Sequence, residues 1–150
     1  MVLSLPETTD EQVAQFQAEF QSAFSGASQE ELESAKCRLI WALVHHSGSR
    51  NHLQRGLDLA EAALENDRCT PDQARELKYL SAVALYNLSS YIKARRAAKA
   101  LLAEHPDFRQ AQALASECDD LVLRDGLVGV GVLGAVLGVG IGLLVGASRR

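Results

Sequence analysis

The side chains that most often carry chemistry in proteins are few in this chain, and their spacing matches no catalytic or metal-binding motif. No two of its four histidines lie four residues apart around a glutamate, as a helical zinc motif requires (His45, His46, His52 and His105). The three cysteines lack metal-ligand spacing, and their odd number is typical of reduced thiols in a cytosolic protein (Cys37, Cys69 and Cys118). We therefore expect no metal, no cofactor and no enzyme activity.

The charge of the chain argues against a nucleic-acid partner. All 19 acidic residues and all but two of the 15 basic residues precede residue 127, so this part of the chain is mildly acidic. Its acidic cluster is typical of a solvated helix face (Glu117, Asp119 and Asp120). The opening sequence MVLSLPETTDEQ has neither the basic start nor the apolar run of a signal peptide.

A long apolar segment closes the sequence. Leu127 to Ala147 is 21 residues without a charged side chain. A helix rises about 1.5 Å per residue, so this length reaches the roughly 30 Å hydrocarbon core of a bilayer. We expect a single transmembrane tail anchor over residues 125–147, followed by a basic tail over 148–150, with the preceding chain facing the cytosol.

The glycines of this anchor recur every four residues, at Gly134, Gly138, Gly142 and Gly146. Such a ridge of small residues allows two membrane helices to approach closely, which predicts a homo-oligomer formed through the anchor. Alternatively, these glycines only keep the hydrophobicity moderate, because glycine is common in membrane helices anyway.

The chain before the anchor has the apolar periodicity of an all-α domain, which we expect over residues 13–124 after an N-terminal arm over 1–12. Apolar side chains at intervals of three and four define one face of a first helix (Val13, Phe16, Phe20 and Phe24). Ser28 with Glu31 forms a capping-box pattern that opens a second helix, which runs through about His46.

Four further helices follow in the same way. A turn over 47–51 precedes the third, and Thr70 followed by Pro71 starts the fourth, which continues through Leu88. The fifth spans about Tyr91 to Glu104, and the sixth begins near Asp107. No segment alternates between apolar and polar residues for long enough to predict a strand.

Two of the expected helical hairpins repeat with a shift of 38 residues. Trp41 precedes Gly56 by the same interval that separates Tyr79 from Ala94, and further positions obey the shift (Val44 and Ala82, Leu53 and Tyr91, Ala60 and Ala98, Leu64 and Leu102). In the second hairpin, the small, aromatic, small and proline positions of a tetratricopeptide repeat fall on Ala82, Tyr91, Ala94 and Pro106. The alternative is a chance pattern in an alanine-rich bundle.

Taken together, these features resemble the mitochondrial fission 1 protein family. Matching residues cover nearly the whole chain, including Phe16–Ser22, Trp41–Val44 and the junction Arg124–Gly129, a basic-Asp-Gly entry into the membrane. The sequence departs from the family at His45–Gly48, which replaces a more charged stretch.

The resemblance implies a six-helix tetratricopeptide-like adaptor that recruits a dynamin-like GTPase, directly or through a fission adaptor protein. It implies the cytosolic face of the mitochondrial outer membrane, and also peroxisomes, as its location. Arg149 and Arg150, which follow a moderately apolar anchor, resemble the targeting tails of such outer-membrane proteins.

A partner-binding groove follows from repeat geometry, because the first helix of each hairpin lines the concave face of the stack. This places eight residues on that face: Arg38, Trp41, His45, Glu76, Tyr79, Val83, Tyr86 and Asn87. Such a groove takes an amphipathic helix or an extended peptide through aromatic anchors. Trp41 equally fits a core position, since a lone tryptophan in an all-α domain is often a packing anchor.

Two other functions are weighed beside fission. A tail-anchored receptor for organelle protein import would use the same groove and anchor. A membrane-permeabilising bundle would need a long hydrophobic central hairpin, which the sequence does not contain. The sequence leaves open whether the N-terminal arm covers the groove.

Overall fold

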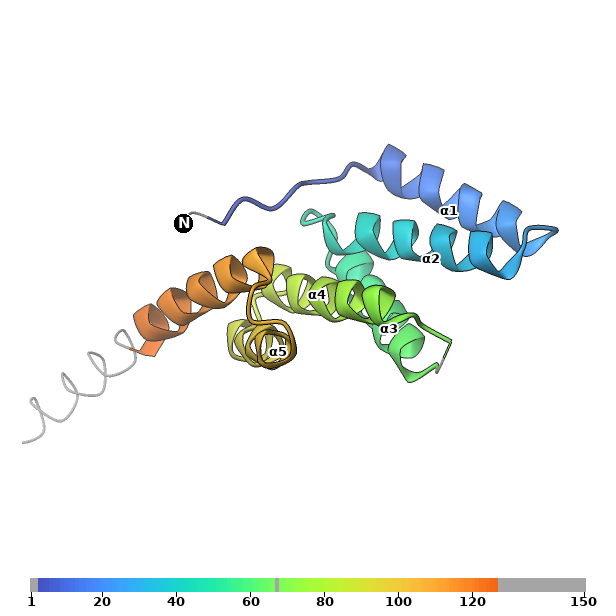
Figure 1. Ribbon diagram of the computed structural model, residues 1–150. Coiled ribbons are helices and arrows are strands. Elements are labelled where there is room, and N and C mark those ends of the chain that lie inside the picture. Colours follow the sequence, from blue (N-terminus) through green and yellow to red (C-terminus); the bar gives the residue numbers. More distant parts are fainter. Residues whose placement is uncertain (1–2, 67, 127–150) are drawn as a thin grey trace, which may run out of the picture. The chain divides into compact units, whose positions relative to one another are not determined.

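The protein is all-α in the part of the chain that the computed structural model describes, residues 3–66 and 68–126 (Figure 1). Five helices are labelled in order: α1 (Asp10–Phe24), α2 (Gln29–Val44), α3 (Arg50–Glu65), α4 (Pro71–Asn87) and α5 (Tyr91–Glu104). A sixth helix occupies residues 109–126, and no strand is present within the described ranges. The expected sequence of six helices is confirmed.

The helices begin where the sequence supplies side chains that cap them. The Ser28 hydroxyl accepts the backbone N–H of Glu31 at 3.3 Å, and the Glu31 carboxylate accepts the backbone N–H of Ser28 at 2.8 Å. Thr70 and Gln73 form the same reciprocal pair before α4, with Pro71 at the first helical position. Each box satisfies backbone donors that the first helical turn leaves free.

The first helix differs from its prediction at both ends. It begins at Asp10, inside the stretch assigned to the arm, because Thr9 and Gln12 form a third capping box. A glutamine in place of the usual glutamate carries that start signal. At the other end, Phe24 is 70% exposed rather than buried with Val13, although its ring meets that of Phe20 at 5.4 Å.

The two hairpins pack as the repeat predicts. Consecutive helices contact one another from α1 to α5, and α2 also contacts α4. Ala82 and Ala94, two of the small positions of the repeat, are fully buried in the main core. A second, smaller cluster joins α1 to α2 through Val13, Leu39 and Leu43. The core therefore runs between neighbouring helices, as in other stacked hairpins.

Gly56 marks the closest approach within the first hairpin. A Cβ atom at this position would lie 2.8 Å from Val44 Cγ1 and 3.0 Å from Leu43 Cβ. Those distances are shorter than van der Waals contact, so α3 can lie this close to α2 only with glycine here. The equivalent residue of the second hairpin, Ala94, carries a Cβ and is accommodated.

The chain divides into two compact units. The first extends to Cys118 and contains α1 to α5 with the first part of the sixth helix, and the second begins at Asp119. Among the described residues, no helix is both long enough and apolar enough to cross a bilayer. The expected anchor, its glycine ridge and the two terminal arginines lie outside the described residues, apart from the anchor's first two residues, 125 and 126.

Candidate partner-binding groove

A hollow of about 530 Å³ lies between α2, α4 and the start of the sixth helix. Four of the residues assigned to the groove from sequence line it: Trp41, His45, Glu76 and Tyr79. They come from the first helix of each hairpin, which repeat geometry places on the concave face. The structure thus brings together, at one hollow, side chains from both repeats.

Aromatic rings form much of this hollow's wall. The Tyr79 ring lies 5.3 Å from that of Phe108, and the Arg75 guanidinium lies 5.8 Å from the Phe108 centroid. On the opposite helix, the rings of Trp41 and His45 are 4.9 Å apart. Rings of this kind offer large apolar faces with polar edges, which suits the recognition of an apolar peptide side chain.

A second hollow of about 190 Å³ shares His45 with the first. Tyr86 and Asn87, two more residues assigned to the groove, line it. Burial raises the pKa of Tyr79, and burial together with the nearby Glu117 raises the pKa of Tyr86. Both phenols therefore stay neutral at physiological pH and keep a hydroxyl for hydrogen bonding.

The N-terminal arm lies across these hollows. Its residues Ser4, Leu5 and Pro6 line the larger one, and Leu3 and Leu5 pack against the main core. Thr8 fixes the arm to the end of α2, where its backbone N–H donates to the His45 carbonyl at 3.1 Å. Its hydroxyl donates to the Ala42 carbonyl at 2.6 Å, in a buried bond. The arm therefore covers part of the groove.

His45 occupies the join between the two hollows. Its side chain is buried, and Nδ1 donates to the Trp41 carbonyl at 2.7 Å, which fixes Nε2 as the unprotonated nitrogen of the neutral ring. Burial lowers the pKa of His45, although the bond to Trp41 opposes this shift. His45 is thus a neutral, apolar-lined element of the groove at physiological pH.

Three residues assigned to the groove lie in other surroundings. Val83 is fully buried in the main core, so we do not retain it as a surface contact. Arg38 faces α1, where its Nε lies 3.4 Å from a Glu19 carboxylate oxygen, and it lines a separate hollow. Asn87 reaches the groove only partly, because its amide donates to the Val44 carbonyl at 2.8 Å.

Sequence analysis missed the residues that complete the groove from outside the two hairpins. Leu5 comes from the arm, and Phe108 and Gln110 come from the start of the sixth helix. Repeat periodicity carries no signal for them. The one available cue was Phe108 itself, a large apolar residue directly after the Pro106 break.

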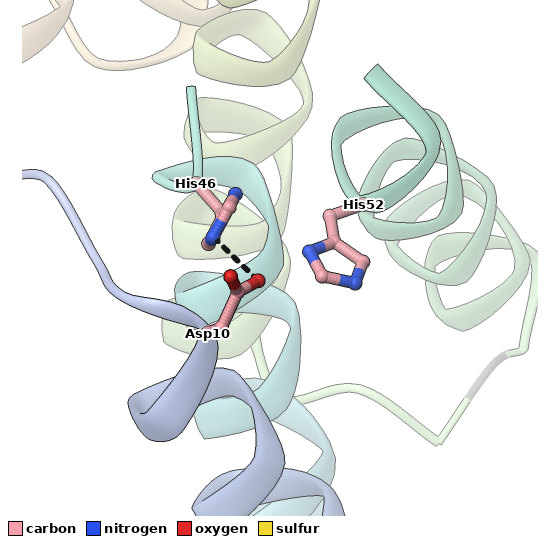
Figure 2. A group of neighbouring side chains, drawn as sticks. All are labelled: Asp10, His46 and His52. Carbon is pink, nitrogen blue, oxygen red and sulfur yellow. Dashed lines mark ion pairs between the residues drawn. The ribbon is translucent and has the colours of Figure 1, made fainter. Parts of the chain in front are cut away.

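One group of polar side chains outside the groove could hold a metal ion. Asp10, His46 and His52 each offer a ligand atom, and these atoms all lie within 4.8 Å of one another (Figure 2). The three residues belong to the start of α1, the end of α2 and the first turn of α3, so no linear motif joins them.

Two proteins of Arabidopsis thaliana are similar to most of this chain. Mitochondrial fission 1 protein A is 30% identical over 142 residues, which is 95% of this chain and 82% of that protein. Mitochondrial fission 1 protein B is 34% identical over 124 residues, 81% of this chain and 73% of that protein. This chain belongs to the mitochondrial fission 1 protein family. Residues 75–127 also match the family described as Fis1 C-terminal tetratricopeptide repeat.

Two crystal structures show the same fold. Fis1 from Saccharomyces cerevisiae superposes with a TM-score of 0.68 over 83% of this chain and 92% of that one. Yeast Fis1 in complex with an Mdv1 fragment containing N-terminal extension and coiled coil domains gives 0.67 over 80% and 89%. Both are 17% identical to this chain, so they establish the tetratricopeptide-like architecture of this family member.

Family membership settles the class of function. Proteins of the mitochondrial fission 1 family are tetratricopeptide-like adaptors rather than enzymes, and their role lies in mitochondrial fission. The prediction of a non-enzymatic adaptor is confirmed on that ground. Binding of a partner, rather than conversion of a substrate, is therefore the chemistry to seek in the groove.

Proposed function

We propose that this chain recruits a dynamin-like GTPase, or the adaptor protein of such a GTPase, through the groove, and so promotes the fission of mitochondria and of peroxisomes. The groove residues are Trp41, His45, Glu76, Tyr79, Tyr86 and Asn87 from α2 and α4, with Phe108 from the start of the sixth helix. The adaptor role in mitochondrial fission comes from the family; the choice of partner and the second organelle are our proposals.

One observation supports this groove above all: an extended, apolar segment of the chain already lies in it. Leu3 and Leu5 of the arm pack against the core, beside the aromatic rings of Trp41 and Tyr79. A surface that accommodates one extended apolar segment has the shape and chemistry to accept another. The yeast Fis1 structure with an Mdv1 fragment supports a partner of the adaptor kind, because that protein has the same fold.

The arm's own contacts indicate how a partner would gain access. Its polar attachments are few and concentrated near one end, at Thr8 and in the hydrogen bond from Ser47 to Glu7 at 2.6 Å. Residues 3–6 lie beyond these attachments. We infer that a partner displaces residues 3–6 or binds beside them, while Thr8 stays in place.

The test compares two charge reversals of the same kind. Glu76 lines the groove, whereas Glu61 is an exposed residue of α3 that lines none of the hollows described above. Full-length protein with a fluorescent tag at its N-terminus is expressed as wild type, Glu76→Arg or Glu61→Arg. We expect Glu76→Arg to leave organelles elongated and to lose co-purification of the GTPase, because a new positive charge enters an apolar groove. Glu61→Arg should behave as wild type.

The import-receptor alternative uses the same groove, so the same cells are assayed for uptake of precursor proteins. Loss of fission with normal import supports the fission adaptor. Loss of import with unchanged organelle shape would replace our proposal with the import receptor.

We also propose that the protein is a single-pass protein of the mitochondrial outer membrane, facing the cytosol, with a further population on peroxisomes. The support is the apolar composition of residues 127–147 and the two arginines after them. Replacing Arg149 and Arg150 with serine should shift the protein toward the endoplasmic reticulum. Replacing Gly138 and Gly142 with leucine should weaken crosslinking between copies; undiminished crosslinking would remove the homo-oligomer from this proposal.

A further inference from the structure

Three side chains that are distant in the sequence meet beside the attachment point of the arm. Asp10 is the first residue of α1, His46 follows the end of α2, and His52 lies in the first turn of α3. Figure 2 shows the His46 ring directed at the Asp10 carboxylate and one nitrogen of His52 turned toward the same point. A carboxylate oxygen of Asp10 lies 3.1 Å from His46 Nε2, and the two imidazole rings are 4.8 Å apart at an interplanar angle of 87°.

Both histidines are held firmly enough to act as ligands. Only 10% of the His46 side chain is exposed, and His52 is half-buried. The backbone N–H of His52 donates to the Ser49 hydroxyl at 3.3 Å, which fixes the turn that carries the ring. By contrast, the Asp10 side chain is 86% exposed. The cluster is therefore open to solvent on one side and enclosed by protein on the other.

The cluster also contains buried nitrogen atoms whose hydrogen-bonding capacity is unused. His52 Nδ1 and His46 Nδ1 are buried and have no hydrogen-bond partner among the described residues. A buried polar atom without a partner costs about 1–3 kcal/mol, so such an atom calls for an explanation. A hydrogen bond between Asp10 and His46 explains neither of these atoms.

Two imidazole nitrogens and one carboxylate oxygen form a ligand set with a definite preference. Zinc binds such atoms at about 2.0–2.2 Å, often with three protein ligands and a water molecule in the fourth position. Calcium and magnesium prefer sets made of oxygen atoms, so this set disfavours both. Ligand atoms of one zinc ion lie at most about 4.2 Å apart at these bond lengths, so small side-chain rotations suffice from the separation of 4.8 Å or less.

We propose that Asp10, His46 and His52 bind a divalent first-row metal ion of the Zn²⁺ type, with a fourth coordination position open to solvent. The ion ties the start of α1 to the end of α2 and to α3. Since Thr8 is fixed to the end of α2 two residues before Asp10, the same ion holds the base of the arm.

The test is a Zn²⁺ titration of the full chain, purified in detergent micelles without a histidine tag and freed of metal with a chelator. We expect one equivalent of Zn²⁺ to bind in calorimetry, to raise the melting temperature, and to be reversed by chelator. Co²⁺ should give the visible absorption of a low-symmetry nitrogen and oxygen site. Absence of both binding and stabilisation at excess Zn²⁺ would overturn the proposal.

Matched variants connect the metal to these residues. His52→Asn and Asp10→Asn should each weaken Zn²⁺ binding by at least about tenfold, because even the loss of an outer-sphere partner costs 10–100-fold. Both residues are at least partly exposed, so these variants should still fold. The controls are His105→Asn and Asp107→Asn, which make the same changes elsewhere. Equal loss in His105→Asn and His52→Asn would show surface binding only and would overturn the site.

Discussion

The two hairpins, α2–α3 and α4–α5, have the same residue spacing but end their first helices in different ways. The end of α4 is satisfied locally, since Ser89 N–H donates to the Tyr86 carbonyl and Ser90 N–H to the Leu85 carbonyl, both at 2.9 Å. This is the pattern of a Schellman motif. The end of α2 instead uses distant donors: Thr8 for Ala42 and His45, and Asn87 for Val44 (bonds described above).

This difference shows how one repeat can be specialised without changing its fold. The second hairpin closes on itself and needs no outside residue to end its first helix. The first hairpin leaves carbonyl groups available, and both the arm and α4 attach there. We infer that the first hairpin is the structural junction of the domain, and that the second is a self-contained unit beside it.

The largest expected effect tests how tightly the first hairpin is closed. Gly56→Ala places a Cβ atom 2.8 Å from Val44 Cγ1 and 3.0 Å from Leu43 Cβ, an atom that only backbone movement can displace. We expect the free energy of unfolding to fall by about 1–3 kcal/mol, despite alanine's better helix propensity. The measurement is urea denaturation followed by circular dichroism.

The matched change in the second hairpin is Ala94→Gly, which removes a fully buried methyl group and should cost about 1 kcal/mol. The two substitutions exchange the residues found at equivalent positions. If Gly56→Ala were neutral or stabilising, the close approach of α3 to α2 would not be what requires glycine.

A second prediction breaks the attachment of the arm. Thr8→Val keeps the shape of the side chain but leaves the buried Ala42 carbonyl without its hydroxyl donor. We expect a loss of about 1–2 kcal/mol in the free energy of unfolding. Hydrogen exchange of residues 3–8 should also become faster, because the arm loses one of its attachments. The control is Ser47→Ala, which removes an exposed hydrogen bond to Glu7 and should cost less than about 0.5 kcal/mol.

A third prediction sharpens the comparison from the side of the second hairpin. Ser89 has a φ of 60°, the left-handed conformation that a Schellman motif usually gives to glycine. Ser89→Gly should therefore raise the free energy of unfolding by up to about 1 kcal/mol. The equivalent residue in the first hairpin, Asn51, lies within α3, so Asn51→Gly should destabilise by a similar amount. Stabilisation by both changes would mean that the two turns do not differ as described.

Sequence reasoning predicted what local chemistry determines. The boxes at Ser28 and Thr70 located two helix starts, and the shift of 38 residues located the small residues that let paired helices approach. Depth within the fold was harder to predict. Val83 lies close in sequence to true groove residues, but its exposure depends on packing by neighbouring helices, which periodicity does not contain.

The arm and the metal cluster were beyond sequence reasoning for a related reason. The arm has no helical periodicity, and its position depends on tertiary bonds such as that from Thr8 to Ala42. Asp10, His46 and His52 come from three separate elements, so their meeting depends on the packing of α1, α2 and α3. In both cases the relevant signal lies in the assembled fold rather than in any short stretch of sequence.

The smallest expected effect concerns pH and again separates the two hairpins. His45 and Val83 occupy equivalent buried positions, so only the first hairpin has an ionisable group there. Burial holds the pKa of His45 below its ordinary value of 6.5. Between these two pKa values the unfolded chain binds more protons than the folded one, so stability falls as the pH falls through this range.

His45→Val should remove that part of the acid sensitivity. The variant starts from a lower stability at pH 7, because the bond from Nδ1 to the Trp41 carbonyl is lost. The informative quantity is therefore the slope of unfolding free energy against pH below about 6.5. We expect a shallower slope in His45→Val than in wild type, with His105→Asn as the histidine control. Equal slopes in His45→Val and wild type would mean that the acid sensitivity of the domain arises outside the first hairpin's groove position.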